Sequence, residues 1–378
     1  MIPRNVYTEE HDMFRDAVRK FMQREIEPHT EQWEKDGHIS REAWKKAGDA
    51  GILCTHLPAE YGGSEVDFRY SAIAIEEQMR VFATGPGFSL HSDIVAPYIL
   101  HYGNEEQKQK WLPQMASGDV ISAIAMTEPG AGSDLAGVRT TAVLDGDDYV
   151  INGSKTFITN GQMADLIVVV AKTDTSAGAK GVSLFLVEAD RAGFQRGQNL
   201  NKVGMKAQDT SELFFDNVRI PKGNLLGQEN KGFIYLMQEL PQERLSVALM
   251  AVGAMRACYE ATVEYVKERK AFGKPIAALQ NTRFKLAEIL TEVEVTQAYV
   301  DRCLALHCEG QLSVEAAASC KLWATEAQCR IIDECVQLHG GYGYMWEYPV
   351  ARAYADARVQ RIYAGTSEIM KEIISRTI

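Results

Sequence analysis

The sequence predicts an α+β protein with an N-terminal helical domain (residues 1–120), a middle β-barrel or β-sandwich domain (121–232) and a C-terminal four-helix-bundle domain (233–378). Three observations support this organisation. Apolar residues recur every three and four positions in the first and last thirds of the chain. Short β-rich runs occupy the middle third. At 378 residues, the chain is also longer than a usual single domain.

The first third begins with a predicted helix at Thr8, because a hydroxyl residue followed by Glu9 and Glu10 is typical of a helix N-terminus. Further helical patterns cover residues 41–52, 70–81 and 105–115, and glycine-containing loops separate them. The whole segment is therefore expected to be helical.

The composition changes after Gly118. Five β-rich runs follow, at residues 120–126, 149–160, 166–174, 181–189 and 210–221. No helical pattern separates these runs, so we do not expect a doubly wound parallel sheet.

The last third is helical again from Gly232. We expect Pro241 to mark the start of a long amphipathic helix that ends before Gly273 and Pro275. Two more helices are predicted, from residue 284 to about 307 and from 314 to 339.

Composition and charge exclude several functions. The net charge of −11 argues against nucleic-acid binding, and no apolar run is long enough to span a bilayer. Seven cysteines without a CxxC pair and eight histidines without metal-ligand spacing predict reduced thiols and no metal site. No targeting peptide is visible, so we expect a cytoplasmic protein, or a mitochondrial-matrix protein if a transit peptide has been removed.

Several segments combine glycine, hydroxyl and aromatic residues as a ligand site would. The segment "MTEPGAGSD" (126–134) fails as a dinucleotide fingerprint because Leu135 stands where a glycine is required; it suggests either a loop with free backbone N–H groups or an ordinary β-turn. The segment "KTFITNG" (155–161) places Phe157 and Thr159 on one strand face, suited to contact a ring or to pack in a core. The three glycines of "QLHGGYG" (337–343) exceed the needs of a helix C-cap.

Taken in order, "MTEPGAGSD", "FITNG", "RKAFGKPI", "QLHGGYGY" and "IYAGTSEIM" resemble the acyl-CoA dehydrogenase family over essentially the whole chain, and its long-chain branch most closely. The resemblance implies an FAD enzyme that desaturates acyl-CoA thioesters between Cα and Cβ, giving trans-2-enoyl-CoA. It also implies that electrons pass to an electron-transfer flavoprotein. A homotetramer is expected, because a neighbouring subunit would complete each cofactor site.

The resemblance assigns three groups of residues to FAD. The first two motifs would contact the flavin, residues near 269–280 and 337–341 would reach the adenosine and pyrophosphate of a neighbouring subunit, and the final turn would return to the flavin. The expected residues are Ile124, Met126, Thr127, Gly132, Ser133, Phe157, Ile158, Thr159, Arg269, Phe272, Gln280, Gln337, Leu338, Gly340, Gly341, Thr366 and Glu368.

The final turn lacks the expected base. In the common branch of the family, a glutamate just before the Gly-Thr of this turn removes the α-proton, but Ala364 stands there in this chain. The resemblance to the long-chain and isovaleryl branches assigns the base to Glu243. A solvated glutamate in the first turn of a helix is the alternative for Glu243, and Glu239 and Glu368 are rival bases.

The resemblance also implies a substrate site, with the Ala364 N–H group bonded to the thioester carbonyl. The expected residues are Ser133, Arg244, Tyr363, Ala364, Gly365 and Arg376. The missing carboxylate at 364 frees volume for long or branched acyl chains, and Pro97 is expected to widen the pocket by interrupting a helix. The alternatives are an isovaleryl-like or terpenoid acyl-CoA dehydrogenase, an acyl-CoA oxidase or flavin monooxygenase on the same fold, and an inactive acyl-CoA/FAD-binding assembly protein.

Overall fold

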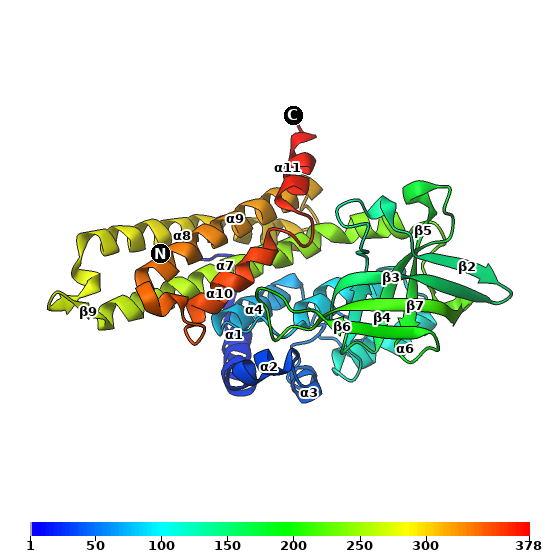
Figure 1. The fold of residues 1–378 in the computed structure, drawn as a ribbon, viewed down its shortest axis with the longest axis horizontal. Coiled ribbons are helices and arrows are strands. Elements are labelled where there is room, and N and C mark those ends of the chain that lie inside the picture. The colour runs from blue at the N-terminus through cyan, green and yellow to red at the C-terminus, as the bar shows by residue number, and fades with distance from the viewer. Residues whose placement is uncertain (1) are drawn as a thin grey trace.

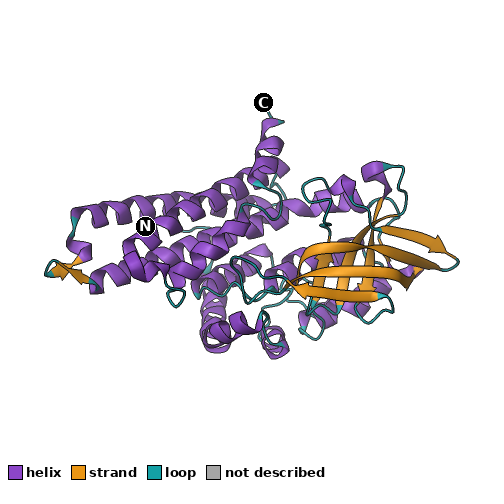
Figure 2. Cartoon of the chain, viewed as in Figure 1, coloured by secondary structure: helices purple, strands orange, loops and turns teal. Residues whose placement is uncertain are grey.

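The computed structural model describes residues 2–378 and confirms the predicted α–β–α organisation (Figure 1). The strands of the large sheet gather at one side of the molecule, and helices form the rest apart from a small two-stranded hairpin at the opposite end (Figure 2). Among residues 2–378, no helix is both long and apolar enough to cross a membrane. All seven cysteines are free thiols.

The N-terminal part consists of short helices packed around buried aromatic and aliphatic residues. Thr8 caps the first helix, as predicted, and its side chain interacts reciprocally with His11. A π-helical turn at Leu90–Val95 leads without a break into the next helix. The expected interruption of the helix at Pro97 is therefore wrong. Pro97 lies in the first turn of the α-helical part, where its missing N–H is tolerated. The helices are α1 (Glu9–Phe21), α2 (Thr30–Asp36), α3 (Arg41–Asp49), α4 (Phe68–Arg80), α5 (Ala96–Tyr102) and α6 (Glu105–Ala116).

The middle part forms one eight-stranded sheet that bends into two layers. Strands pair in the order β6-β7-β3-β2 and then β4-β5-β8, and the two halves meet only where Thr141 pairs with Lys172. β1 adds to the free side of β4 in parallel. The strands are β1 (Ser122–Ala125), β2 (Thr141–Asp145), β3 (Asp148–Thr159), β4 (Leu166–Lys172), β5 (Val182–Glu188), β6 (Phe194–Asn199), β7 (Thr210–Pro221) and β8 (Leu225–Leu226).

Strand β4 joins the sheet to the N-terminal helices. Successive strand side chains point to opposite faces, so Ile167 and Val169 pack between the two layers while Val168 and Val170 pack on the helical core. Both faces are buried, which explains why "LIVVVAK" is continuously apolar.

The C-terminal part is built on α7 (Gly232–Glu268), a helix of 37 residues and about 55 Å. Pro241 lies inside this helix, so the expectation that it marks the helix start is wrong. The helix continues because flanking residues pack on the N-terminal helices and the sheet, which outweighs the hydrogen bond that proline removes. Glu243 is therefore held in the interior of a long helix.

Three further helices pack along α7, and a fourth closes the chain. A small hairpin of β9 (Lys270–Ala271) and β10 (Lys274–Pro275) follows α7 at one end of the bundle (Figure 1). The helices are α8 (Gln280–Cys308), α9 (Val314–His339), α10 (Pro349–Gln360) and α11 (Ser367–Ser375).

Candidate active site

Glu243 is a buried carboxylate on the face of α7 that meets α5. Its side chain is only 5% exposed, and the Tyr98 hydroxyl donates a 2.9 Å hydrogen bond to Oε1. Burial raises the pKa of Glu243 to about 7, and the charge of Glu239 adds to this shift, whereas the Tyr98 hydrogen bond and Arg244 oppose it. A carboxylate with this pKa is suited to act as a general base near neutral pH.

Glu239 lies one helical turn before Glu243, but two residues of α5 bind its carboxylate. His101 Nδ1 and the Tyr102 hydroxyl each lie 2.8 Å from Glu239 Oε1. Its side chain is committed to these two contacts, which makes it a weaker candidate base than Glu243.

Arg244 is a buried cation directly after the base. Its side chain is 4% exposed, and its Nε has no hydrogen-bond acceptor among residues 2–378. Burial lowers the pKa of the guanidinium. Leaving a buried charge unpaired is costly, so this side chain is suited to receive a negatively charged or carbonyl group.

The turn between α10 and α11 has an unusual backbone. Ala364 and Gly365 both have positive φ angles, of 52° and 96°. No acceptor within residues 2–378 takes up the N–H groups of Ala364, Gly365 or Thr366. Successive free N–H groups in such a turn form a concave binding site for a carbonyl or anionic oxygen.

This turn packs against α7 as well as α9. The Tyr363 hydroxyl lies 3.8 Å from Met250 Sδ, and Met250 follows Glu243 by seven residues, which is two turns along the same face of α7. Two turns are about 10 Å, so Glu243 and the contact with the final turn lie along one face of α7 at about this separation. Thr366 caps α11, and Glu368 is exposed in the first turn of that helix.

The loop at residues 126–133 is held by a buried ion pair. Lys155 on β3 is fully buried, and its Nζ lies 2.8 Å from Glu128 Oε1 and 3.0 Å from the Met126 carbonyl. Glu128 also accepts hydrogen bonds from the N–H groups of Arg139 and Thr140. Burial lowers the pKa of Lys155 to about 8, and Glu128 opposes this shift.

This loop fits a flat polar ligand such as a flavin. Within residues 2–378, the N–H groups of Thr127, Gly132 and Ser133 have no acceptor, and the space beside Gly132 is open. The Thr156 N–H bonds to the Thr127 carbonyl at 2.9 Å, which places the neighbouring Phe157 ring beside the loop. Phe157 is 67% exposed, so its ring is free to cover a ligand. These residues therefore fit a flavin.

Two expected cofactor residues have side chains directed into the core. Ile124 and Ile158 are both buried, so only their backbone is available to a ligand. Phe157 has a positive φ of 59°, and the pairing of β3 with β7 shifts between Lys155 and Ile158. This bulge explains why Phe157 and Thr159 leave the core while Ile158 stays in it.

The residues expected to reach the adenosine form a separate group. The Arg269 guanidinium lies 5.4 Å from the Tyr342 ring centroid, and the Tyr265 hydroxyl bonds to the His339 carbonyl, so the end of α7 meets the end of α9. Phe272 is 92% exposed. Gln280, Gln337, Gly340 and Gly341 are exposed as well, and Leu338 is half-buried. In Figure 1, the β9 end of the bundle lies away from β3 and α11, so one chain does not bring both groups together.

Arg376 lies away from the other expected substrate residues. It follows α11, pairs with Glu372 at 3.3 Å, and has a side chain 70% exposed. Sequence reasoning also missed three buried polar residues: Tyr98 beside Glu243, Lys155 beside Glu128, and Lys321, whose Nζ lies 2.7 Å from the Gly365 carbonyl oxygen. The only sign of these residues in the sequence was that a tyrosine and two lysines stand among the mostly apolar residues of a strand or helix.

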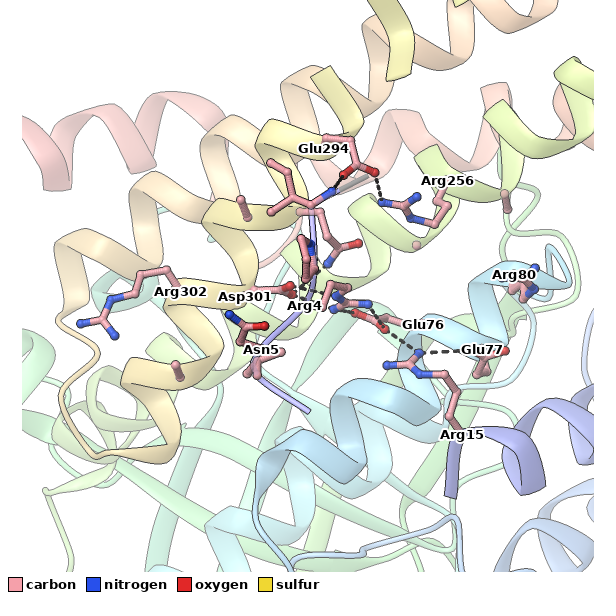
Figure 3. A pocket seen from close by; sticks show the side chains of 18 of the residues that line it. Arg4, Asn5, Arg15, Glu76, Glu77, Arg80, Arg256, Glu294, Asp301 and Arg302 are labelled. Carbon is pink, nitrogen blue, oxygen red and sulfur yellow. Dashed lines mark hydrogen bonds and ion pairs between the residues drawn. The ribbon is translucent and has the colours of Figure 1, made fainter. Parts of the chain in front are cut away.

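A cavity of about 590 Å³ lies elsewhere, between the N-terminal segment, α1, α4, α7 and α8 (Figure 3). Ion pairs line it; Arg4 contacts both Glu76 and Asp301, and Arg15 contacts Glu76 and Glu77. None of the expected site residues lines this cavity, and its charged walls do not suit an acyl chain.

The three-part fold, the buried carboxylate of Glu243 and the two sets of free N–H groups fit a flavin-dependent dehydrogenase of acyl thioesters. Family models of the acyl-CoA dehydrogenase N-terminal, middle and C-terminal domains match residues 8–119, 123–218 and 230–378. The chain therefore belongs to the acyl-CoA dehydrogenase family.

Individual relatives match over nearly the whole chain. The mitochondrial long-chain specific acyl-CoA dehydrogenase of Sus scrofa is 57% identical over 99% of this chain and 88% of its own length. The crystal structure of an acyl-CoA dehydrogenase from Geobacillus kaustophilus is 52% identical, with a TM-score of 0.97 over 99% of both chains. A Mycobacterium smegmatis glutaryl-CoA dehydrogenase in complex with FADH2 is 31% identical, with a TM-score of 0.93 over 98% of this chain and 95% of that one.

Proposed function

We propose that this protein desaturates long-chain or methyl-branched acyl-CoA thioesters between Cα and Cβ, with Glu243 as the base that removes the α-proton. One observation carries the assignment of the base. Glu243 is buried and has its pKa raised to about 7, while Ala364, at the position of the usual base, has no titratable group.

The residues of the chain prepare the substrate for proton removal. The free N–H groups of the 364–366 turn donate to the thioester carbonyl oxygen, which increases the acidity of the α-proton. The deprotonated Glu243 then accepts that proton, and the Tyr98 hydroxyl bound to its Oε1 orients the carboxylate. Bound FAD supplies the acceptor for the hydride that leaves the β-carbon. The 126–133 loop and Phe157 hold and cover the cofactor.

The preference for long or branched chains is supported by the position of the base. Because the proposed base, Glu243, lies on α7, the final turn does not need a carboxylate at position 364. The methyl group of Ala364 leaves space beside the substrate. Arg244, buried and without an acceptor for its Nε, is assigned to the CoA side of the thioester.

We also propose that the protein is a homotetramer that passes electrons to an electron-transfer flavoprotein. The two groups of expected FAD residues lie apart on one chain, so a neighbouring copy is needed to complete each cofactor site. The seven free thiols favour a reducing compartment such as the cytoplasm.

The test is an acyl-CoA dehydrogenation assay with ferrocenium as electron acceptor, run over a series of straight and branched acyl-CoA chains. Glu243→Gln should lower kcat by roughly 10²- to 10⁴-fold while FAD content is retained. Glu239→Gln is the matched control on the same helix and should keep most activity. Full activity of Glu243→Gln would refute the base assignment, and an inactive wild type with bound FAD would favour a binding protein.

A further inference from the structure

Lys321 is a buried lysine that the proposed chemistry does not yet use. It lies on α9, its side chain is fully buried, and its Nζ donates a 2.7 Å hydrogen bond to the carbonyl oxygen of Gly365. Burying an ammonium group costs free energy unless hydrogen bonds or an opposite charge compensate for the lost water. We therefore ask what the contact of Lys321 with the final turn contributes.

The contact fixes the direction of the neighbouring N–H group. The Gly365 carbonyl and the Thr366 N–H belong to one trans peptide, in which the two groups point in opposite directions. With the carbonyl turned toward Lys321, the Thr366 N–H points to the other side of the turn. That N–H has no acceptor among residues 2–378, which leaves it available to a bound molecule.

The turn needs an external anchor because its backbone is strained. Ala364 adopts a positive φ of 52°, a conformation that is unfavourable for a residue with a Cβ atom. A substituent at Gly365 would meet Met370 Cε at 2.6 Å, so the turn is also closely packed. Such conformations persist where surrounding contacts hold them.

A second residue of α9 holds the other side of the turn. Glu326 Oε1 accepts hydrogen bonds from Ser367 Oγ at 2.7 Å and from Arg361 Nε at 2.8 Å. The carboxylate therefore ties together the two ends of the 361–367 segment, and Lys321 holds its middle.

The charge of Lys321 also matches the reaction. Removal of the α-proton shifts negative charge onto the thioester oxygen, which the 364–366 N–H groups would contact. Burial and the nearby positive charge of Arg244 lower the pKa of Lys321 to about 8, while Glu326 and Glu368 oppose the shift. The ammonium therefore stays protonated at pH 7, behind the peptide that carries the Thr366 N–H.

We propose that Lys321 is a positioning residue of the dehydrogenation: it holds the Gly365 carbonyl so that the N–H group of Thr366 faces the bound substrate and cofactor, with its positive charge behind that peptide. This inference rests on the proposed function. Lys321 forms and breaks no covalent bond; the α-proton still passes to Glu243.

The test compares Lys321→Met and Lys321→Gln with wild type in the FAD-loaded enzyme. Lys321→Met removes both charge and donor, and Lys321→Gln keeps an N–H donor without the charge. Lys267→Met is the control, since Lys267 is exposed on α7 and pairs with Glu264. The readouts are kcat, KM and the rate at which deuterium from D2O enters the substrate α-carbon.

We expect Lys321→Met to lower kcat and α-exchange by roughly 10- to 100-fold with KM changed less than threefold, and Lys321→Gln to recover part of the loss. If Lys321→Met does not fold, Lys321→Gln alone should still reduce both rates. Unchanged kcat and exchange in a folded Lys321 variant would overturn the inference. A wild type inactive with every acyl-CoA would overturn the proposed function, and this inference with it.

Discussion

The Tyr98 hydroxyl donates a 2.9 Å hydrogen bond to Glu243 Oε1, and both side chains are buried. Burial and the carboxylate itself raise the pKa of Tyr98 well above its usual value, so the phenol stays protonated and can only donate to Glu243 at neutral pH. The Glu243 carboxylate is thus held in one orientation by α5. Its pKa reflects the balance between burial, Glu239, Tyr98 and Arg244.

The first prediction is that Tyr98→Phe raises the pKa of Glu243. The hydrogen bond favours the carboxylate, and a bond to a charged group contributes about 1.5–3 kcal/mol, which corresponds to roughly one pH unit or more. Only deprotonated Glu243 accepts the α-proton, so the acidic limb of the kcat/KM profile should move to higher pH. Activity at pH 7 should fall, with recovery at pH 9.

Tyr102→Phe is the matched control. Tyr102 is another tyrosine of α5, but its hydroxyl bonds to Glu239 rather than to Glu243. Its removal should move the profile much less. An acidic limb that stays in place in Tyr98→Phe would mean that the hydrogen bond does not set the protonation of the base.

The second prediction is a shift in the opposite direction for Glu239→Gln. Glu239 raises the pKa of Glu243 because two negative charges one turn apart repel each other. Neutralising Glu239 should move the acidic limb of the kcat/KM profile to lower pH by about half a unit. The shift is small because the interaction between the two carboxylates is partly shielded. A shift to higher pH, or none, in a folded variant would show that the two carboxylates do not interact.

The sequence was sufficient to predict the order of the parts and to single out the carboxylate that we propose as the base. Five β-rich runs became β1, β3, β4, β5 and β7, and the third C-terminal helix has the expected bounds of Val314–His339. Ala364 showed that the usual base is missing from the final turn, and the resemblance to the long-chain and isovaleryl branches then directed attention to Glu243.

Other features depend on packing that no local pattern reveals. Proline is disfavoured in the interior of a helix and tolerated in its first turn, so Pro241 suggested a helix start. Tertiary contacts on both sides of Pro241 nevertheless keep α7 continuous at this residue. The partners of Tyr98, Lys155 and Lys321 lie 145, 27 and 44 residues away, so their hydrogen bonds follow from topology alone. The two-residue strands β9 and β10 are too short to produce any periodicity.

The third prediction concerns the ion pair beneath the flavin loop. Lys155→Met should leave the Glu128 carboxylate buried without its cation and lower the free energy of unfolding by roughly 3 kcal/mol. The same change frees the Met126 carbonyl, so FAD retention should fall as well. Urea unfolding and flavin absorbance per chain measure the two effects.

A double variant separates charge from packing at this site. Glu128→Gln combined with Lys155→Met removes the unpaired charge while keeping similar side-chain volumes, so part of the lost stability should return. If the double variant is as unstable as the sum of the two single variants, the ion pair does not stabilise the loop.

The last prediction moves the base to the final turn. Glu243→Gly should abolish nearly all turnover, and adding Ala364→Glu should recover at least roughly tenfold, because a general base contributes about 10²–10⁴ in rate. The backbone at 364 already carries a Cβ atom at a positive φ of 52°, so the longer side chain adds no new backbone strain. Since the new carboxylate would occupy space beside the substrate, the recovered activity should favour shorter acyl chains than the wild type does. Assays over an acyl-CoA series measure both effects. Recovery with an unchanged chain preference would contradict the argument that the methyl group of Ala364 makes room for long chains. No recovery would mean that a base on this turn does not reach the α-carbon.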